Sequence, residues 1–383
     1  MSHSSPPVVI DPSAPYALAE FFRTVKLEAE GPPSPPWEKK PTLKSFEKAI
    51  QLGRHHLPMP YEKAFIQPLE KQLERVLKHT LAQSAASTTD QTEFEPAEAI
   101  FSALYSHAPG SKVNEQLRRF GAVISGLFNS FLHAEKIRGL NLPVIECLPP
   151  LPSFKQRSSG PFTLPVDFLE ETIGASIAIV SLPSVYRNDP LLWTSLAHET
   201  GGHDVTHATP GLLDELRGVI RNWFRGASAR FRASGSQEMA RNAEQFGEVW
   251  AAWVDEASAD VCGVLNLGPT FGLTFAAWLG ALRSVIAKQD KPALLTLSTS
   301  SPTAPLDPHP VDWLRPYLAL GATQTLSNLS DARRAAYADS ITRFMHESNP
   351  APEFIGVAGK LTPAGHGSVS IELKLPPQVA AQI

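Results

Sequence analysis

The sequence predicts a mainly α-helical protein with a small β-sheet, that is, an α+β fold. Long segments carry apolar residues at spacings of three and four, the period of an amphipathic helix. Two short stretches instead have the β-branched or alternating pattern of strands. With 383 residues, the chain can bury a full-sized core in one large domain or two ordinary ones.

Residues 1–45 are predicted to form an extended, proline-rich N-terminal arm or tail. Prolines cluster in "SSPPVVIDPSAP" and "EGPPSPPWEKKPT", and proline removes a backbone donor and moves the preceding residue out of the helical region. Phe21, Phe22 and Trp37 could pin this segment to the rest of the protein as an arm, and a disordered tail is the alternative.

Residues 46–148 are predicted to form a helical subdomain. Stretches such as "YEKAFIQPLEKQLERVLKHTLAQS" and "VNEQLRRFGAVISGLFNSFLHAEKIRGL" have helical apolar spacing. The histidines of this half have no partner at metal-ligand spacing, so we expect them to be surface or packing residues. They are His55, His56, His79, His107 and His133. Prolines cluster again over residues 148–165, which predicts a connection and a boundary near residue 150.

Residues 149–383 are predicted to form a second domain. "ASIAIVSLP", residues 175–183, predicts a strand, and a helix should follow it with Asp189 as N-cap and Pro190 in the first turn. Further helices are predicted over residues 212–231, 238–265 and 271–288, and the alternating "HGSVSIELKLP" predicts a late edge strand.

The stretch "HETGGH", residues 198–203, contains two potential metal ligands. His198 and His203 are five residues apart, so a regular α-helix would separate them by about 140°. Gly201 and Gly202 lie between them, and glycine allows one extra residue to be absorbed as a π-type bulge. A bulge would bring both histidines to one side of the helix, where they could bind one ion.

A third ligand is expected from the helix that carries "DEASAD", residues 255–260. Glu256 and Asp260 are four residues apart and share a helical face with apolar neighbours. Carboxylates rarely enter such surroundings unless they are paired or bind a metal. We expect Glu256 to be the ligand and Asp260 to orient a metal-bound imidazole; a solvated acidic helix edge is the alternative.

"HETGGH" followed by "DEASAD" resembles the HExxGH and ExxxE/D pair of the gluzincin metallopeptidases, in the form used by dipeptidyl peptidase III. The resemblance covers residues 190–265 and implies a compact zincin-like catalytic domain that uses a Zn²⁺ ion. It implies zinc ligation by His198, His203 and Glu256, a general base at Glu199, and an outer carboxylate at Asp260.

The stretch "DPHPVDWLRPY", residues 307–317, contains side chains that could donate hydrogen bonds to the oxyanion of a tetrahedral intermediate. Its His-Pro segment with a following arginine resembles a late element of several gluzincin peptidases. This makes His309 and Arg315 the candidates, with Tyr317 third and Tyr186 as a further possibility.

Two alternatives concern the surroundings of the site. Glu199, His203 and His207 repeat every four residues, so a metal site could use these three and omit His198. The strand at residues 175–183 could also offer its edge to an extended peptide through main-chain hydrogen bonds.

These features predict a zinc-dependent peptidase that hydrolyses a peptide or small protein. A metal-dependent hydrolase of a non-peptide substrate, or a binding protein with a vestigial metal site, is the alternative; Glu199 favours catalysis because a structural site needs no general base. The net charge of −4 gives no footprint for nucleic acid or an anionic membrane. The chain shows no signal peptide or transmembrane segment, and its two cysteines fit a reducing compartment, so a cytoplasmic location is expected.

Overall fold

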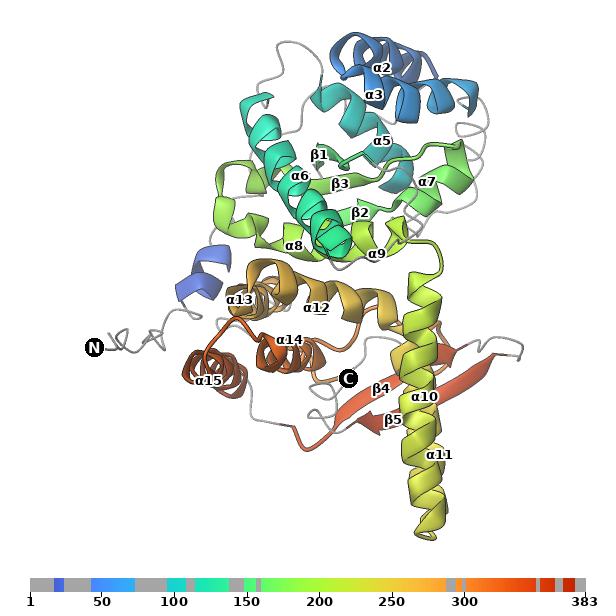
Figure 1. Ribbon diagram of the computed structural model, residues 1–383, viewed down its shortest axis with the longest axis vertical. Helices are drawn as coiled ribbons and strands as arrows, with labels where there is room; N and C mark the ends of the chain where they lie inside the picture. The colour runs from blue at the N-terminus through green and yellow to red at the C-terminus, as the bar shows by residue number, and fades with distance from the viewer. Residues whose placement is uncertain are drawn as a thin grey trace. The chain divides into compact units, whose positions relative to one another are not determined.

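A computed structural model describes the protein over residues 17–23, 43–72, 95–107, 114–137, 148–155, 160–286, 294–297, 301–348, 352–361 and 368–375. It confirms a mainly helical protein with small β-sheets (Figure 1). The chain forms two compact units. Unit 2 spans Glu28–Pro210, and unit 1 combines Met1–Leu27 with Gly211–Ile383. Residue 149, where a domain boundary is predicted, lies inside unit 2.

A three-stranded sheet lies at the centre of unit 2, with strand order β1-β3-β2. Its strands are β1 (Leu151–Lys155), β2 (Phe162–Leu164) and β3 (Ile179–Pro183). β3 pairs in parallel with β1 and antiparallel with β2, and every residue of β3 is buried. The strand predicted at residues 175–183 therefore exists as β3, but the idea that its edge binds a peptide is wrong, because both of its edges are already paired.

Helices cover both faces of this sheet. On one face, Phe46, Leu104 and Ile179 belong to one apolar core; on the other, Phe128 packs with Ala178. Figure 1 shows the strands among α5, α6 and α7. The predicted helices of this half are confirmed where the structure describes them. They are α2 (Leu43–His56), α3 (Met59–Tyr61), the π-helical η2 (Glu62–Ile66), α5 (Glu95–Ser106) and α6 (Asn114–Ile137), and α7 (Val166–Ile173) follows β2.

The proline-rich stretch at residues 148–165, predicted to be a connection, contains β1 and β2. Pro152 lies within β1, opposite Val180 of β3. Proline is tolerated there because β1 is an outer strand of the sheet and has only one paired neighbour. Since Leu151 of β1 and Ile179 of β3 share one apolar core with Phe46 and Leu104, the segment after residue 149 folds together with the helices that precede it.

Unit 1 is built mainly from helices. The described helices after residue 211 are α10 (Leu212–Ala233), α11 (Gln237–Ala252), α12 (Val254–Leu267), α13 (Pro269–Ile286), α14 (Leu314–Thr325) and α15 (Asp331–Ser348). α10 and α11 lie side by side as a helical hairpin (Figure 1), and Gly235, with φ of 83°, provides the left-handed residue in its turn. The predicted helices over residues 212–231 and 271–288 are confirmed.

The helix predicted over residues 238–265 is instead two helices that meet at Trp253. Its backbone angles are φ −87° and ψ 3°. Its indole N–H donates a hydrogen bond to the Asp307 carbonyl at 2.8 Å, and its ring packs edge-on against Trp250. The hydrogen bond and packing of Trp253 thus explain the break between α11 and α12, which the apolar spacing of the sequence does not reveal.

A two-stranded antiparallel sheet completes the description of unit 1. It pairs β4 (Ile355–Leu361) with β5 (Val369–Leu375), so the late strand is confirmed and β4 is an addition. Residues 17–23, inside the predicted arm, are helical with Phe22 buried; Trp37 lies outside the described residues.

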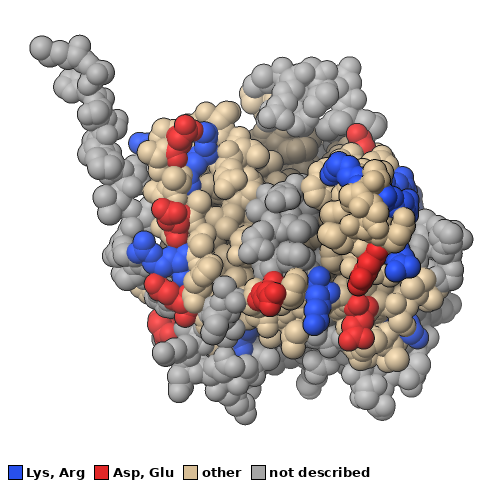
Figure 2. Space-filling view, turned by 90° about the horizontal axis from the view of Figure 1, so that it is seen from below, with Lys and Arg blue, Asp and Glu red and all other residues tan. Residues whose placement is uncertain are grey.

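Two further observations concern the charge distribution on one face of the protein and the hydrophobicity of the described helices. Acidic and basic side chains are interspersed over the face drawn in Figure 2, and neither sign gathers into a broad patch there. Among the described helices, none combines the length and apolar character needed to cross a membrane.

Candidate metal centre

The segment that carries the two histidines changes helix type along its length. It runs through the 3₁₀ turn η5 (Pro190–Ser195), α8 (Leu196–His198), the π-helical η6 (Glu199–Asp204) and α9 (Val205–Ala208). Pro190 lies in the first turn as predicted, whereas Asp189 makes no side-chain capping hydrogen bond. The helix ends at Ala208, and Thr209 is extended before Pro210.

The π-helical turn brings His198 and His203 together. The Val205 backbone N–H donates to the Thr200 carbonyl, a hydrogen bond between residues five apart. In a π-turn, residues five apart face the same side, as residues four apart do in an α-helix. The Nε2 atoms of His198 and His203 lie 3.1 Å apart, with ring planes at 89°. The predicted bulge is therefore confirmed.

The bulge stays within right-handed helical geometry. Neither Gly201 nor Gly202 has a positive φ, so the glycines are not needed for a left-handed conformation; they remove side chains from a widened turn instead. The Thr206 hydroxyl lies within hydrogen-bonding distance of the Gly202 carbonyl, at 2.9 Å, and helps to satisfy the backbone of the distorted turn.

The spacing of the two imidazole nitrogens fits a zinc ion. Zn–N bonds of about 2.0–2.1 Å at a tetrahedral angle place two ligand nitrogens roughly 3.3 Å apart, close to the 3.1 Å between the Nε2 atoms of His198 and His203. His198 is buried and His203 is partly exposed. The pair thus combines a fixed geometry with access from one side.

Glu199, the predicted general base, is buried and held by a neighbouring strand. The Thr163 hydroxyl of β2 lies 2.8 Å from Glu199 Oε2 and 3.1 Å from the Glu199 carbonyl oxygen. Thr163 was not predicted as a site residue because it lies in the stretch taken for a connection. Only the spatial pairing of β2 with the sheet brings it to this helix.

Two further acidic groups flank the end of this helix in unit 2. Burial raises the pKa of Asp204 to about 8, although nearby His207 opposes the shift. His207 Nδ1 lies 2.7 Å from Asp167 Oδ2 on α7. A carboxylate that accepts the second ring N–H is a common partner of a metal-binding histidine, so this pair alone does not remove His207 from consideration as a ligand.

In unit 1, the carboxylates of α12 meet a buried arginine of α14. Arg315 is 5% exposed, and its Nε and Nη2 donate to the two oxygens of Asp260 at 2.8 and 2.9 Å. Arg315 Nη2 also donates to Glu256 Oε2 at 3.2 Å. The alternative prediction, that these carboxylates form a solvated acidic edge of the helix, is therefore wrong for Asp260, which is fully buried.

This network determines the charge state of Arg315. Burial alone would lower the pKa of its guanidinium, but Asp260, and after it Glu256, raise the pKa above its usual value. The arginine stays charged and also stacks over the Phe275 ring at 4.7 Å. Because two of its nitrogens are committed to carboxylates, the geometry favours a positioning role for Arg315 over the predicted oxyanion donor.

The remaining predicted donors lie in different surroundings. His309 is exposed, with Nε2 3.2 Å from Glu256 Oε1 and Nδ1 3.0 Å from Asp307 Oδ1. Tyr317 on α14 is partly buried, which raises the pKa of its phenol. Tyr186 is completely buried in unit 2, which does not favour contact with a substrate. His309 is the candidate that combines exposure with contact to the predicted ligand Glu256.

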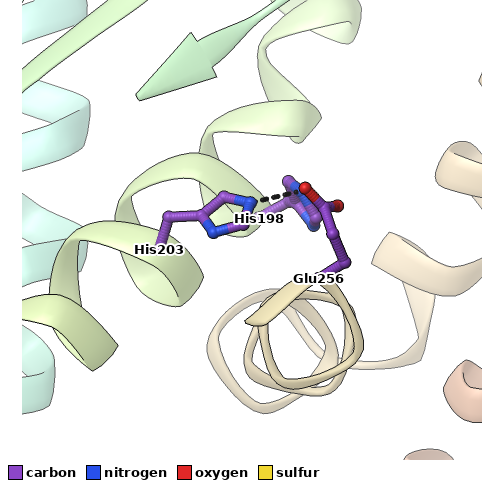
Figure 3. Close-up of side chains that lie close together, drawn as sticks. All are labelled: His198, His203 and Glu256. Carbon is purple, nitrogen blue, oxygen red and sulfur yellow. Dashed lines mark hydrogen bonds between the residues drawn. The ribbon is translucent and has the colours of Figure 1, made fainter. Parts of the chain in front are cut away.

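Two groups of side chains could hold a metal ion among the described residues. One comprises His198, His203 and Glu256, which Figure 3 draws, and the other His203, His207 and Asp255. Glu199 belongs to neither group, so the alternative site that uses Glu199 as a ligand is not supported. The first group is the ligand set predicted from the two motifs.

Comparison with protein-family models, with curated proteins and with solved structures finds no match for this chain.

Proposed function

We propose that the protein is a zinc-dependent metallopeptidase in which His198, His203 and Glu256 hold the ion and Glu199 is the general base. The observation that carries this proposal is the π-turn, which places two imidazole nitrogens at the spacing of ligands on one ion. Such turns are rare and occur frequently at functional sites.

The roles of the side chains follow from their positions. When bound, zinc lowers the pKa of a water molecule and polarises a carbonyl group. Glu199 directly follows a ligand in the chain, and it accepts the proton of the attacking water and returns it to the leaving amine. Arg315 holds the Glu256 and Asp260 carboxylates in place, which restricts the orientation of the proposed third ligand.

The choice of a peptidase over another metal-dependent hydrolase is supported by the two motifs together. The HExxGH and ExxxE/D pair is the pattern that the gluzincin peptidases use, and the substrate proposed is accordingly a peptide or small protein. His309 is proposed as the oxyanion donor because it is exposed and lies against Glu256. Orientation of an imidazole by Asp260 is part of the same proposal.

Metal analysis of purified variants tests the ligand set. We expect one zinc per wild-type chain, loss of zinc in His203→Ala and Glu256→Ala, and full zinc content in the matched control His207→Ala. If His207→Ala lost the metal while His198→Ala kept it, the second group of side chains would be the site.

A peptide library tests the reaction. Wild type should cleave some members, and Glu199→Ala should keep its zinc but lose activity by a factor of about 10²–10⁴, the usual contribution of a general base. A wild type that binds zinc but cleaves no peptide would contradict the peptidase, and an active Glu199→Ala variant would contradict the mechanism.

A further inference from the structure

Thr163 is the described side chain that contacts the Glu199 carboxylate, and neither motif contains it. Its hydroxyl lies 2.8 Å from Glu199 Oε2 and 3.1 Å from the Glu199 backbone carbonyl. A hydroxyl has one proton to donate, and hydrogen bonds to an ionised acceptor are shorter and stronger than neutral ones. Donation to Oε2 therefore prevails when Glu199 is ionised.

The pairing of β2 explains why Thr163 reaches this position. Thr163 lies opposite Val180 in the antiparallel pair of β2 and β3. Because successive strand residues point to opposite faces, its neighbours Phe162 and Leu164 turn the other way, into the core formed with α2 and α5. The sheet thus presents one hydroxyl to η6 and fixes it through its two neighbours, of which Leu164 is buried and Phe162 is partly buried against the core.

The contact is compatible with proton transfer at Glu199. With Oε2 held by Thr163, the other oxygen, Oε1, accepts the proton of the attacking water. Once Oε1 carries that proton, Oε2 is still an acceptor for the Thr163 hydroxyl. The proton then leaves from Oε1 to the amine. While the carboxyl is neutral, Oε2 at 2.8 Å is still nearer to the Thr163 hydroxyl than the backbone carbonyl at 3.1 Å, so the hydrogen bond to Oε2 is retained. The orientation of the base is therefore the same in both of its protonation states.

We propose that Thr163 is a positioning residue that fixes the Glu199 carboxylate and assigns Oε1 as its proton-transferring oxygen. This inference rests on the proposed peptidase function. Removing the hydroxyl should reduce turnover with little effect on substrate binding, because the hydrogen bonds of Thr163 are to Glu199 and it acts through that residue. Loss of orientation at a catalytic group costs up to about 10²-fold in rate.

The test compares Thr163→Val, which keeps the shape, with Thr163→Ser, which keeps the hydroxyl, in the full-length zinc-loaded protein. On a peptide that wild type cleaves, we expect Thr163→Val to lower kcat by about 10- to 100-fold, with KM within about twofold of wild type and zinc content unchanged. Thr163→Ser should restore kcat to within about threefold. Thr163→Ala is measured as well, in case valine prevents folding.

A second readout does not depend on zinc or activity. In metal-free protein, Thr163→Val should lower the folding equilibrium constant by about tenfold when Glu199 is present, since a hydrogen bond to a charged group stabilises by that order. The same substitution should have less than about a threefold effect in a Glu199→Ala background, where the contact is already lost.

The outcomes separate the two proposals. If wild type cleaves peptides and Thr163→Val and Thr163→Ala both keep wild-type kcat, the positioning role is overturned while the peptidase stands. Equal loss of kcat in Thr163→Ser and Thr163→Val would also overturn it, because the hydroxyl would then not matter. If wild type neither binds zinc nor cleaves peptides, the proposed function fails and the role of Thr163 fails with it.

Discussion

Replacing Arg315 with methionine should destabilise unit 1 by about 3–5 kcal/mol, the cost of leaving a buried charge without its partner. Arg315 is 5% exposed and Asp260 is fully buried. Three hydrogen bonds, at 2.8, 2.9 and 3.2 Å, join the guanidinium to Asp260 and Glu256. Methionine fills much of the volume beside Phe275, so the loss is mainly electrostatic and not a cavity effect.

The double variant Arg315→Met, Asp260→Leu separates these contributions. Replacing a buried ion pair by apolar residues of similar volume is often close to neutral. In the double variant, Glu256 still loses its hydrogen bond from Arg315, but its side chain is less buried than that of Asp260. We therefore expect the double variant to recover at least about 1–2 kcal/mol relative to Arg315→Met alone, a coupling typical of residues in one ionic network.

Urea unfolding followed by tryptophan fluorescence provides the measurement, because Trp250, Trp253 and Trp313 are buried in unit 1. Arg333→Met is the matched control, since Arg333 is exposed on α15 and its replacement should change stability by less than about 0.5 kcal/mol. A loss below about 1 kcal/mol for Arg315→Met, or no recovery in the double variant, would refute the description of a buried and mutually dependent network.

Three other perturbations test separate parts of the structure. Burial lowers the pKa of His107 from 6.5 to about 4, so the unfolded state binds more protons between these values. Stability should fall by up to about 3 kcal/mol as the pH drops through that window, and His107→Gln should flatten the dependence in acid unfolding curves. A Cβ at Gly247 would lie 2.9 Å from Phe224 Cβ, so Gly247→Ala should lower thermal stability by about 1–3 kcal/mol. Gly218→Ala, with nothing within 4 Å of its Cβ, should leave it unchanged or stabilise it by up to about 1 kcal/mol; equal effects of the two would contradict the packing. A chelator should lower the melting temperature of zinc-loaded wild type, by an amount equivalent to about 4 kcal/mol if zinc was present at 1,000 times its Kd. His203→Ala should not respond, and an equal response would mean that the stabilising metal lies elsewhere.

The helices could be predicted from the sequence because their signal is local. The apolar spacing in "LLDELRGVIRNWFRGASARF" specifies α10 without reference to the rest of the chain. β1 and β2 could not be predicted in the same way, since they contain five and three residues and lie among prolines. What makes Pro152 acceptable is the place of β1 at the edge of the sheet, which depends on pairing with β3.

The candidate site shows the same division between local and distant information. His198, Glu199 and His203 lie on one short helical segment, so their spacing and the two glycines were enough to predict the bulge. The contacts of Thr163 with Glu199 join residues 36 apart in the chain, and those of Arg315 with Asp260 join residues 55 apart. No local spacing contains that information, and it depends on how the strands and helices of each unit pair.

The extra residue in "HETGGH" has a consequence for packing as well as for the histidines. One residue inserted into a helix turns everything after it by about 100° relative to a regular α-helix. In the observed arrangement, Val205 and Ala208, just after the π-turn, are buried in the cluster formed with Phe128 and Val166. A regular α-helix through the same sequence would separate the two imidazoles by about 140° and would turn these two residues, together with His203, away from that core. The π-turn is therefore the geometry in which this sequence can align His198 with His203 and still bury the residues that follow.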